Sequence, residues 1–245
     1  MADFETIIYE KRDGIAYITL NRPKALNAYN VRMRDELYEA LGAIKDDLEV
    51  RAVILKGAGE KAFCAGADLT EFLTAPPPVF AREARFARDV WGLFLSIKQP
   101  VIAALHGYVL GSGIEMALCC DIRLASDDAR FGLPETGLGI IPAAGGSQTL
   151  PRTIGASAAL DMLLTGRWLT AAEALKLKLV NRVVARADLL PQAEKLARKI
   201  ESMNSLVVRY VKQAVKSGLD LTLAEGLALE ARLAESLASA TGNNG

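Results

Sequence analysis

The sequence predicts an α/β fold whose C-terminal part is entirely helical. Short apolar runs typical of strands alternate with segments of helical periodicity as far as about residue 187, which favours layers of sheet and helix. Beyond that point the strand signal disappears. With 245 residues, 51% of them hydrophobic, the chain is long enough to bury one sizeable core. We therefore expect a core over residues 1–187 and a helical region over residues 188–245.

Five apolar runs are predicted as strands, because each is bounded by Gly, Pro, Asn or charged residues. They are residues 15–20, 52–56, 101–110, 122–125 and 179–184.

Apolar residues at helical spacing predict helices between these strands. Leu37, Leu41 and Ile44 recur in this way within residues 31–47, and a similar pattern runs through residues 80–98. Three further helices are predicted in the C-terminal region, over residues 189–203, 206–215 and 223–237.

The last of these segments carries leucines that need cover, namely Leu227, Leu229, Leu233 and Leu237. Helical pattern alone favours packing within the chain over a contact between subunits. Both interpretations stay open at this point.

Charge and composition exclude several classes of function. Lysine plus arginine equals aspartate plus glutamate at 29 each, so no global attraction to nucleic acid or an anionic membrane is expected. No apolar run approaches the roughly 18 to 20 residues that span a bilayer, and the charged N-terminus lacks the apolar stretch of a secretory signal. We expect a soluble cytoplasmic protein.

The histidine and cysteine content argues against a metal centre or a disulfide framework. His106 is the one histidine and stands in an apolar stretch without other ligands beside it. The three cysteines, Cys64, Cys119 and Cys120, are an odd number, and two are neighbours, so we interpret them as small buried hydrophobes. We expect no metal site.

Two glycine-rich turns follow predicted strands. The first, KAFCAGADL, ends at Asp68, a suitable residue to begin the short helix LTEFL. The second, VLGSGIE, precedes an apolar helix that includes Met116. A helix start leaves N–H groups without intrahelical partners, and two such groups in a dry site suit a developing enolate oxygen. Taken alone, the first turn is better explained as an ordinary tight turn, and neither turn is specific by itself.

Two carboxylates lie beside these turns. Glu115 is in the first turn of the second helix among apolar neighbours, where burial disfavours its charge and the helix N-terminus favours it. Glu135 follows Pro134 in a loop that precedes the glycine-rich residues 137–146. Taken alone, each glutamate is more simply explained as an ordinary helix or surface residue. Together with two oxyanion candidates they suggest general acid–base chemistry on one substrate.

At this point the chain resembles the crotonase (enoyl-CoA hydratase/isomerase) family over nearly its whole length. The segments that carry the resemblance are LNRPKALNAYN, KAFCAGADLTEF, HGYVLGSGIEMALCCDIRLAS, ARFGLPETGLGIIPAAGGSQTLPRTIG and LTGRWLTAAEALKLKLVNRVV. The resemblance implies a spiral of ββα turns followed by helices that build trimers, often paired into hexamers. Residues 188–245 therefore become an expected oligomerisation region, against the preference from helical pattern alone.

The resemblance also implies the parts of an acyl-CoA site. The oxyanion hole would use the backbone N–H groups of Ala67 and Ser112; a glycine is usual at the second position, but the donor is main chain. Arg22 and Lys24 are placed to meet the phosphates of coenzyme A. The residues implied to bind the substrate and its coenzyme A part are Lys24, Ala25, Leu26, Ala65, Asp68, Leu69, Gly111 and Pro134. Coenzyme A belongs to the substrate, so no separate cofactor is expected.

Hydratases of the family resemble this chain in carrying both glutamates. By that likeness the acids hold a water over the C2=C3 bond; Glu115 helps to activate it for attack at C3, and Glu135 delivers a proton to C2. Many isomerases keep only the acid at the position of Glu135. An isomerase, or a hydratase or hydrolase of cyclic or aromatic-derived acyl-CoA, is the alternative within the family. One departure is Ala143, where a glycine is common.

Two alternatives come from other classes of protein. A nucleotide-binding dehydrogenase would explain Gly111 and Gly113 after a strand, but Met116 occupies the position of the third glycine of that motif. A non-catalytic scaffold protein on the same fold is the other alternative, since a fold does not guarantee activity. The presence of both glutamates argues against it.

Overall fold

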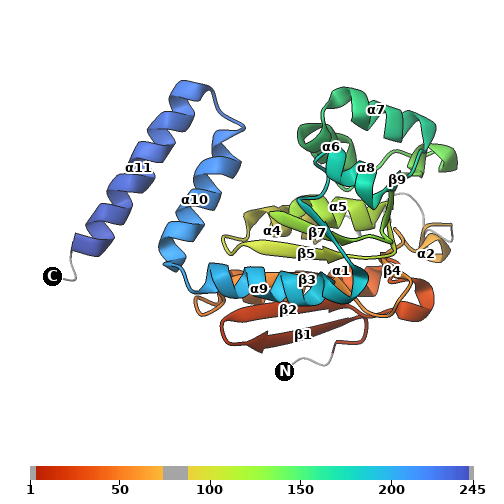
Figure 1. The fold of residues 1–245 in the computed structure, drawn as a ribbon, viewed down its shortest axis with the longest axis horizontal. Helices are drawn as coiled ribbons and strands as arrows, with labels where there is room; N and C mark the ends of the chain where they lie inside the picture. Colours follow the sequence, from red (N-terminus) through yellow and green to blue (C-terminus); the bar gives the residue numbers. More distant parts are fainter. Residues whose placement is uncertain (1–3, 74–87, 243–245) are drawn as a thin grey trace.

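The structure, a computed structural model, describes residues 4–73 and 88–242 (Figure 1). Within these residues the strands form a six-stranded sheet of order β1-β2-β3-β5-β7-β10 and a four-stranded sheet of order β4-β6-β8-β9. Helices cover the two sheets, and the last two helices project from one end as an arm (Figure 1).

The strands are β1 (Ile7–Arg12), β2 (Ile15–Leu20), β3 (Ala52–Gly57), β4 (Ala62–Cys64), β5 (Val101–Leu105), β6 (Tyr108–Leu110), β7 (Ile122–Ser126), β8 (Arg130–Gly132), β9 (Leu169–Thr170) and β10 (Arg182–Val184). The α-helices are α1 (Val31–Asp46), α2 (Leu69–Leu73), α4 (Val90–Ser96), α5 (Ser112–Cys119), α6 (Gly146–Ile154), α7 (Ala156–Thr165), α8 (Ala171–Lys176), α9 (Leu189–Glu201), α10 (Ser205–Gly218) and α11 (Leu223–Gly242). Short 3-10 turns are η1 (Pro23–Ala25), η2 (Glu135–Leu138) and η3 (Arg186–Asp188).

The central strands of the six-stranded sheet, β2, β3 and β5, are buried on both faces. The sheet is parallel from β2 to β10, and only β1 pairs antiparallel, with β2. Along β3, Val53 and Leu55 belong to the main core, whereas Ala52 and Ile54 belong to a second core beneath α9. Burial on both faces explains why these strands read as continuous apolar runs rather than alternating ones.

A repeated path of the chain positions the candidate site. Strands β3, β5 and β7 of the large sheet lead into β4, β6 and β8 of the small sheet, and a helix or 3-10 turn follows each small strand. Because β4, β6 and β8 run parallel, their carboxyl ends meet at one edge of the small sheet. The turns that follow them therefore lie together there, as ligand sites in parallel sheets commonly do. This is the expected ββα spiral.

One predicted strand is wrong in a way that matters for the site. Residues 101–110 do not form a single strand, because the chain bends at His106 and Gly107 and passes from one sheet to the other. Gly107 has a φ of +53°, and a Cβ atom built on it would lie 2.1 Å from the Lys61 carbonyl oxygen. Glycine allows this close approach, which starts β6 in the direction of the site.

The C-terminal region divides into two parts. The predicted helices are confirmed as α9, α10 and α11, but α9 packs on the large sheet through Leu189, Ala193 and Ala197. Helices α10 and α11 instead pack against each other and form the arm (Figure 1). None of the residues of α10 is buried. The predicted boundary at residue 187 stays a prediction. Helix α9 follows this boundary in the sequence but packs against the core.

The predicted helix over residues 80–98 is described only in part. Its C-terminal portion is α4, which Asp89 begins by accepting a hydrogen bond from Gly92 N at 2.8 Å. The remainder, from residue 80 to residue 87, lies outside the described residues. Among the helices that are described, none is long and apolar enough to cross a membrane.

Candidate active site

The first glycine turn leaves β4 and pairs with the segment before α1. Tyr29 N donates to the Gly66 carbonyl at 2.8 Å, and Asp68 N donates to the Tyr29 carbonyl at 2.8 Å. Tyr29 and Ala67 are thus partners in a parallel bridge. In such a bridge the flanking groups make the hydrogen bonds, so the N–H of Ala67 points away from the ladder. This is the orientation that an oxyanion donor needs.

Asp68 begins α2, as the sequence predicts. Its Oδ1 accepts hydrogen bonds from Thr70 N at 3.1 Å and Thr70 Oγ1 at 2.6 Å. Its Oδ2 is 2.9 Å from Nη1 of Arg22, which also donates to the Ala28 carbonyl at 2.6 Å. The bonds from Thr70, and then that from Arg22, hold the pKa of Asp68 below its ordinary value. Arg22 is therefore engaged with the turn itself, and Lys24 is the exposed cation nearby.

The second glycine turn lies against the first. Gly111 precedes α5 with a φ of +49°, and a Cβ atom on it would come within 3.3 Å of Gly66 Cα. The first hydrogen bond of the helix runs from Glu115 N to the Gly111 carbonyl at 3.1 Å. Ser112 N–H lies in the first turn and has no acceptor within the helix. The two predicted oxyanion donors, those of Ala67 and Ser112, are thus on adjoining turns.

Glu115 is buried and held by two backbone amides. Its side chain is 3% exposed, and its Oε1 accepts hydrogen bonds from Ala144 N and Gly146 N, both at 2.9 Å. Amide donors at this distance favour the ionised carboxylate and fix its orientation. A Cβ atom on Gly146 would lie 2.9 Å from the same oxygen, so glycine is needed for the contact. No residue type in the sequence indicates this pair of amides.

Glu135 lies beside the second glycine turn, in an environment that differs from that of Glu115. It opens η2 directly after Pro134, and its Oε1 would be 2.9 Å from a Cβ atom on Gly111. Among the described residues its Oε2 is buried and has no hydrogen-bond partner. Burial, with a further contribution from the charge of Glu115, raises the pKa of Glu135 to about 7. This acid can therefore carry a proton near neutral pH.

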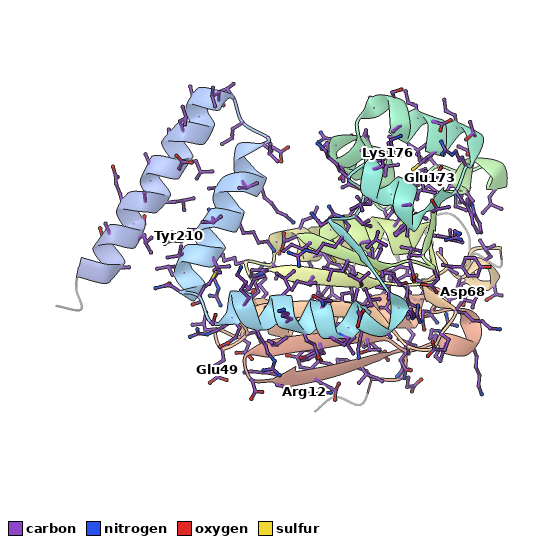
Figure 2. The ribbon with its side chains drawn as sticks, viewed as in Figure 1. Arg12, Glu49, Asp68, Glu173, Lys176 and Tyr210 are labelled. Atoms are coloured by element: carbon purple, nitrogen blue, oxygen red, sulfur yellow. The ribbon has the colours of Figure 1, made fainter. Side chains whose placement is uncertain are left out.

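The implied coenzyme A residues lie beside the first turn. The turn η1 borders a surface depression of about 410 Å³ that is lined by Asn21, Arg22, Pro23, Lys24 and Ala25. Leu26 connects the depression to the site, because its carbonyl accepts a hydrogen bond from Ala65 N at 3.0 Å. Leu69, the first residue of α2, is exposed nearby. The structure thus brings the predicted binding residues and the predicted donors into one continuous region (Figure 2 labels Asp68 within it).

One structural residue of this region was missed. Asn27 is fully buried, and its Nδ2 donates to the Ala58 carbonyl at 2.9 Å and the Ala62 carbonyl at 2.8 Å, while its Oδ1 accepts from Arg22 N at 2.9 Å. These bonds fasten the coenzyme turn to the strands that carry the oxyanion turn. The segment LNRPKALN contains this asparagine, but nothing in its sequence shows which backbone groups it joins.

His106 is buried, and burial lowers its pKa to about 4. Within residues 4–73 and 88–242, no group of three or more His, Cys, Asp or Glu side chains is placed to hold a metal ion.

Two adjoining glycine turns and two unlike carboxylates at the edge of a ββα spiral form a candidate enzyme site. A model of the enoyl-CoA hydratase/isomerase family matches residues 10–243, and the chain therefore belongs to that family.

Curated relatives agree with this assignment. The crotonyl-CoA hydratase of Syntrophomonas wolfei is 41% identical over 93% of this chain and 88% of its own length. The short-chain-enoyl-CoA hydratase of Clostridium acetobutylicum is 42% identical over 93% of this chain and 87% of its own length. The crystal structure of an enoyl-CoA hydratase from Bacillus anthracis superposes with a TM-score of 0.90 at 39% identity, covering 94% of this chain and 90% of that one.

Proposed function

We propose that this protein is an enoyl-CoA hydratase, a hydro-lyase that adds water across the C2=C3 bond of a 2-enoyl-CoA to give a 3-hydroxyacyl-CoA. The observation that carries the proposal is the pair of acids in unlike environments at the edge of the small sheet: Glu115 is held by amides, and Glu135 is buried with a raised pKa. The hydratase names of the relatives support the same reaction.

The glycine turns supply the electrostatic part of the mechanism. Attack at C3 moves negative charge onto the thioester oxygen, where the N–H groups of Ala67 and Ser112 would donate to it. Two fixed backbone donors stabilise such a charge without reorganising, and this is commonly a large part of the rate enhancement. In this proposal Gly111 and Pro134 flank the reacting carbons.

The acids supply the proton transfers. The oxygen of water bonds to C3 while its proton passes to the Glu115 carboxylate, and the proton of Glu135 passes to C2. Return of a proton from Glu115 to Glu135 restores the enzyme. The raised pKa of Glu135 supports the donor role, and the amide bonds to Glu115 support the acceptor role.

Coenzyme A would be gripped locally, because the chain has no net charge. Lys24 is exposed at the depression beside η1 and suits a phosphate group. In this proposal Ala25, Leu26, Ala65 and Leu69 border the path from that depression to the oxyanion turns. Arg22 forms an ion pair with Asp68. In this proposal that pair stabilises the first glycine turn, and Arg22 does not bind the phosphates.

We also propose that copies of the chain associate as trimers, or as pairs of trimers, through the arm. Val207, Val211 and Val215 recur every four residues on α10 and are all exposed, which is the pattern of a face that needs a partner. Leu229, Leu233 and Leu237 of α11 are half-buried within the arm, whereas Leu227 is exposed.

A cytoplasmic location stays a prediction from the sequence.

A hydration assay tests the proposed reaction. We expect the purified protein to consume crotonyl-CoA, with loss of the absorbance of the conjugated thioester, and to yield 3-hydroxybutyryl-CoA by mass spectrometry. Branched and cyclic enoyl-CoAs in the same panel would define the acyl group. Isomerisation of a 3-enoyl-CoA without hydration, cleavage of the thioester, or no reaction at all would each contradict the proposal in favour of an isomerase, a hydrolase or a scaffold.

A further inference from the structure

Helix α5 joins the candidate site to the opposite side of the core. All eight of its residues are buried, and its N-terminal end carries both Ser112 and Glu115. A shift of this helix along its axis would displace the oxyanion donor and the acid together. The contacts at its C-terminal end therefore bear on the site, although they lie about 12 Å away at 1.5 Å per residue.

A guanidinium group holds that C-terminal end from within the core. Arg123, on β7, donates through Nη1 to the Cys120 carbonyl at 2.7 Å and to the Ala117 carbonyl at 3.4 Å. Its Nε donates to the Leu179 carbonyl at 2.7 Å. The planar fork thus ties the last turn of α5 to the segment before β10, a geometry that lysine cannot reproduce.

An ammonium group holds the same end from the arm. Lys216, on α10, donates through Nζ to the Cys119 carbonyl at 3.2 Å and pairs with Asp121 Oδ1 at 2.9 Å. Asp121 is also paired with Lys212 at 2.7 Å, and its Oδ2 accepts from Val101 N at 2.7 Å. The carboxylate is therefore fixed to β5, and it fixes Lys216 in turn.

These contacts complete the helix. The final carbonyls of an α-helix have no partner within it, and cations at that end also offset the negative pole of its dipole. Arg123 and Lys216 donate to three carbonyls at this end, those of Ala117, Cys119 and Cys120. The Ala117 carbonyl also accepts a hydrogen bond from Cys120 N at 3.1 Å. Neither cation reaches the substrate region at the other end.

We propose that Arg123 and Lys216 are positioning residues for the reaction: they clamp the C-terminal end of α5 so that its N-terminal end presents Ser112 N–H and the Glu115 carboxylate in register. The inference rests on the proposed function. Because Lys216 belongs to α10, the arm also contributes to the position of the two groups at the site.

The test compares Arg123→Met and Lys216→Met with Arg209→Met. Arg209 is a matched control, since it is on the same helix as Lys216 and donates to the Leu48 and Val50 carbonyls, away from α5. We expect kcat for crotonyl-CoA to fall roughly tenfold or more in the two clamp variants with KM nearly unchanged, because small displacements of reacting groups are costly. The control should keep the rate of the wild type.

A binding measurement separates positioning from general destabilisation. Acetoacetyl-CoA can bind as an enolate, whereas butyryl-CoA offers only a neutral thioester, so the ratio of their dissociation constants reports the oxyanion donors. We expect the clamp variants, folded by circular dichroism, to lose most of the preference for acetoacetyl-CoA. Arg123→Lys, which keeps the charge but not the fork, should lose it too.

The outcomes distinguish this inference from the proposed function. If the wild type neither hydrates crotonyl-CoA nor prefers acetoacetyl-CoA, the proposed function fails. If the wild type does both and the clamp variants match Arg209→Met in rate and preference, the clamp is overturned. Should Arg123→Met fail to fold, Lys216→Met decides the matter, because Lys216 is at the periphery and one third of its side chain is exposed.

Discussion

Replacing either candidate acid by its amide removes proton transfer and keeps the shape of the side chain. We expect Glu115→Gln and Glu135→Gln each to lower kcat by roughly a hundredfold or more, a typical general acid–base contribution, with affinity for coenzyme A little changed. Glu49→Gln is the control, since Glu49 pairs with the surface residue Lys11 and its side chain is 83% exposed. Steady-state kinetics on crotonyl-CoA measure the effect, and an unaltered rate in either variant would remove that residue from the mechanism.

The raised pKa of Glu135 sets the pH dependence of the reaction. In the proposed reaction this acid acts in its protonated form, and its pKa is about 7 in the folded protein. We therefore expect kcat/KM for hydration to fall as the pH rises through about 7, since kcat/KM reports the free enzyme. A profile from pH 5.5 to pH 9 measures this, and a rate that rises across that range would show that Glu135 acts as a base in this direction.

The same residue should make the folded state less stable at alkaline pH. Its pKa is raised from 4.5, so the folded state binds the proton more tightly than the unfolded state does. The free energy of unfolding then falls as the pH rises from about 4.5 to about 7 and changes no further through this group above it. Glu135→Gln should accordingly raise Tm at pH 8 and leave it nearly unchanged at pH 4.5. Equal shifts of Tm at both pH values would contradict this linkage.

At the scale of elements, the meeting of the two glycine turns depends on Gly111. Its φ of +49° is unfavourable for other residues, and a Cβ atom would lie 2.9 Å from Glu135 Oε1 and 3.3 Å from Gly66 Cα. We expect Gly111→Ala to cost about 1–3 kcal/mol of stability and to impair hydration strongly. Gly137→Ala is the control, because a Cβ atom there meets nothing within 4 Å. Thermal unfolding and kinetics of both variants measure the difference.

Long periodic elements were predictable from the sequence, and short ones were not. The predicted helix over residues 31–47 is α1, Val31–Asp46, which Asn30 begins by accepting a hydrogen bond from Met33 N. Strands of two or three residues, such as β8 and β9, are too short to show a periodic pattern of apolar residues, so the small sheet could not be predicted from that pattern. Strand β1 was missed as well, because its exposed charged residues obscure the apolar pattern. The predicted strand over residues 179–184 shortens to Arg182–Val184, because the N–H groups of Leu179 and Val180 donate to the Ala174 carbonyl in the turn after α8.

The candidate site was predictable where side chains carry the chemistry. Glu115 and Glu135 were predicted from their place beside glycine turns and from the family resemblance, whose motifs also indicate Ala67 and Ser112. The amides that hold Glu115 come from Ala144 and Gly146, and a main-chain donor leaves no trace in residue type. Likewise, the ion pair of Arg22 with Asp68 joins residues 46 positions apart, which no local pattern predicts.

For the whole molecule, the candidate site and the arm lie at opposite ends. Figure 2 labels Asp68 near α2 on one side and Tyr210 of α10 on the other, with the large sheet between them. The arm of one chain therefore does not cover the site of that chain. The proposed clamp on α5 nevertheless links the two, since Lys216 of the arm donates a hydrogen bond to the C-terminal end of α5, the helix that carries Glu115.

The arm should hold the assembly together through its exposed valines. Val211 and Val215 are 59% and 58% exposed, and burying such side chains between copies supplies the main driving force of association. We expect Val211→Glu to shift the protein from a trimer or hexamer towards monomers, because an unpaired carboxylate would have to be buried in the contact. Gln213→Glu, which adds the same charge to an exposed residue on another face of α10, should leave the assembly intact. Light scattering after size-exclusion chromatography measures both, and a wild type that runs as a clean monomer would count against the arm as an interface.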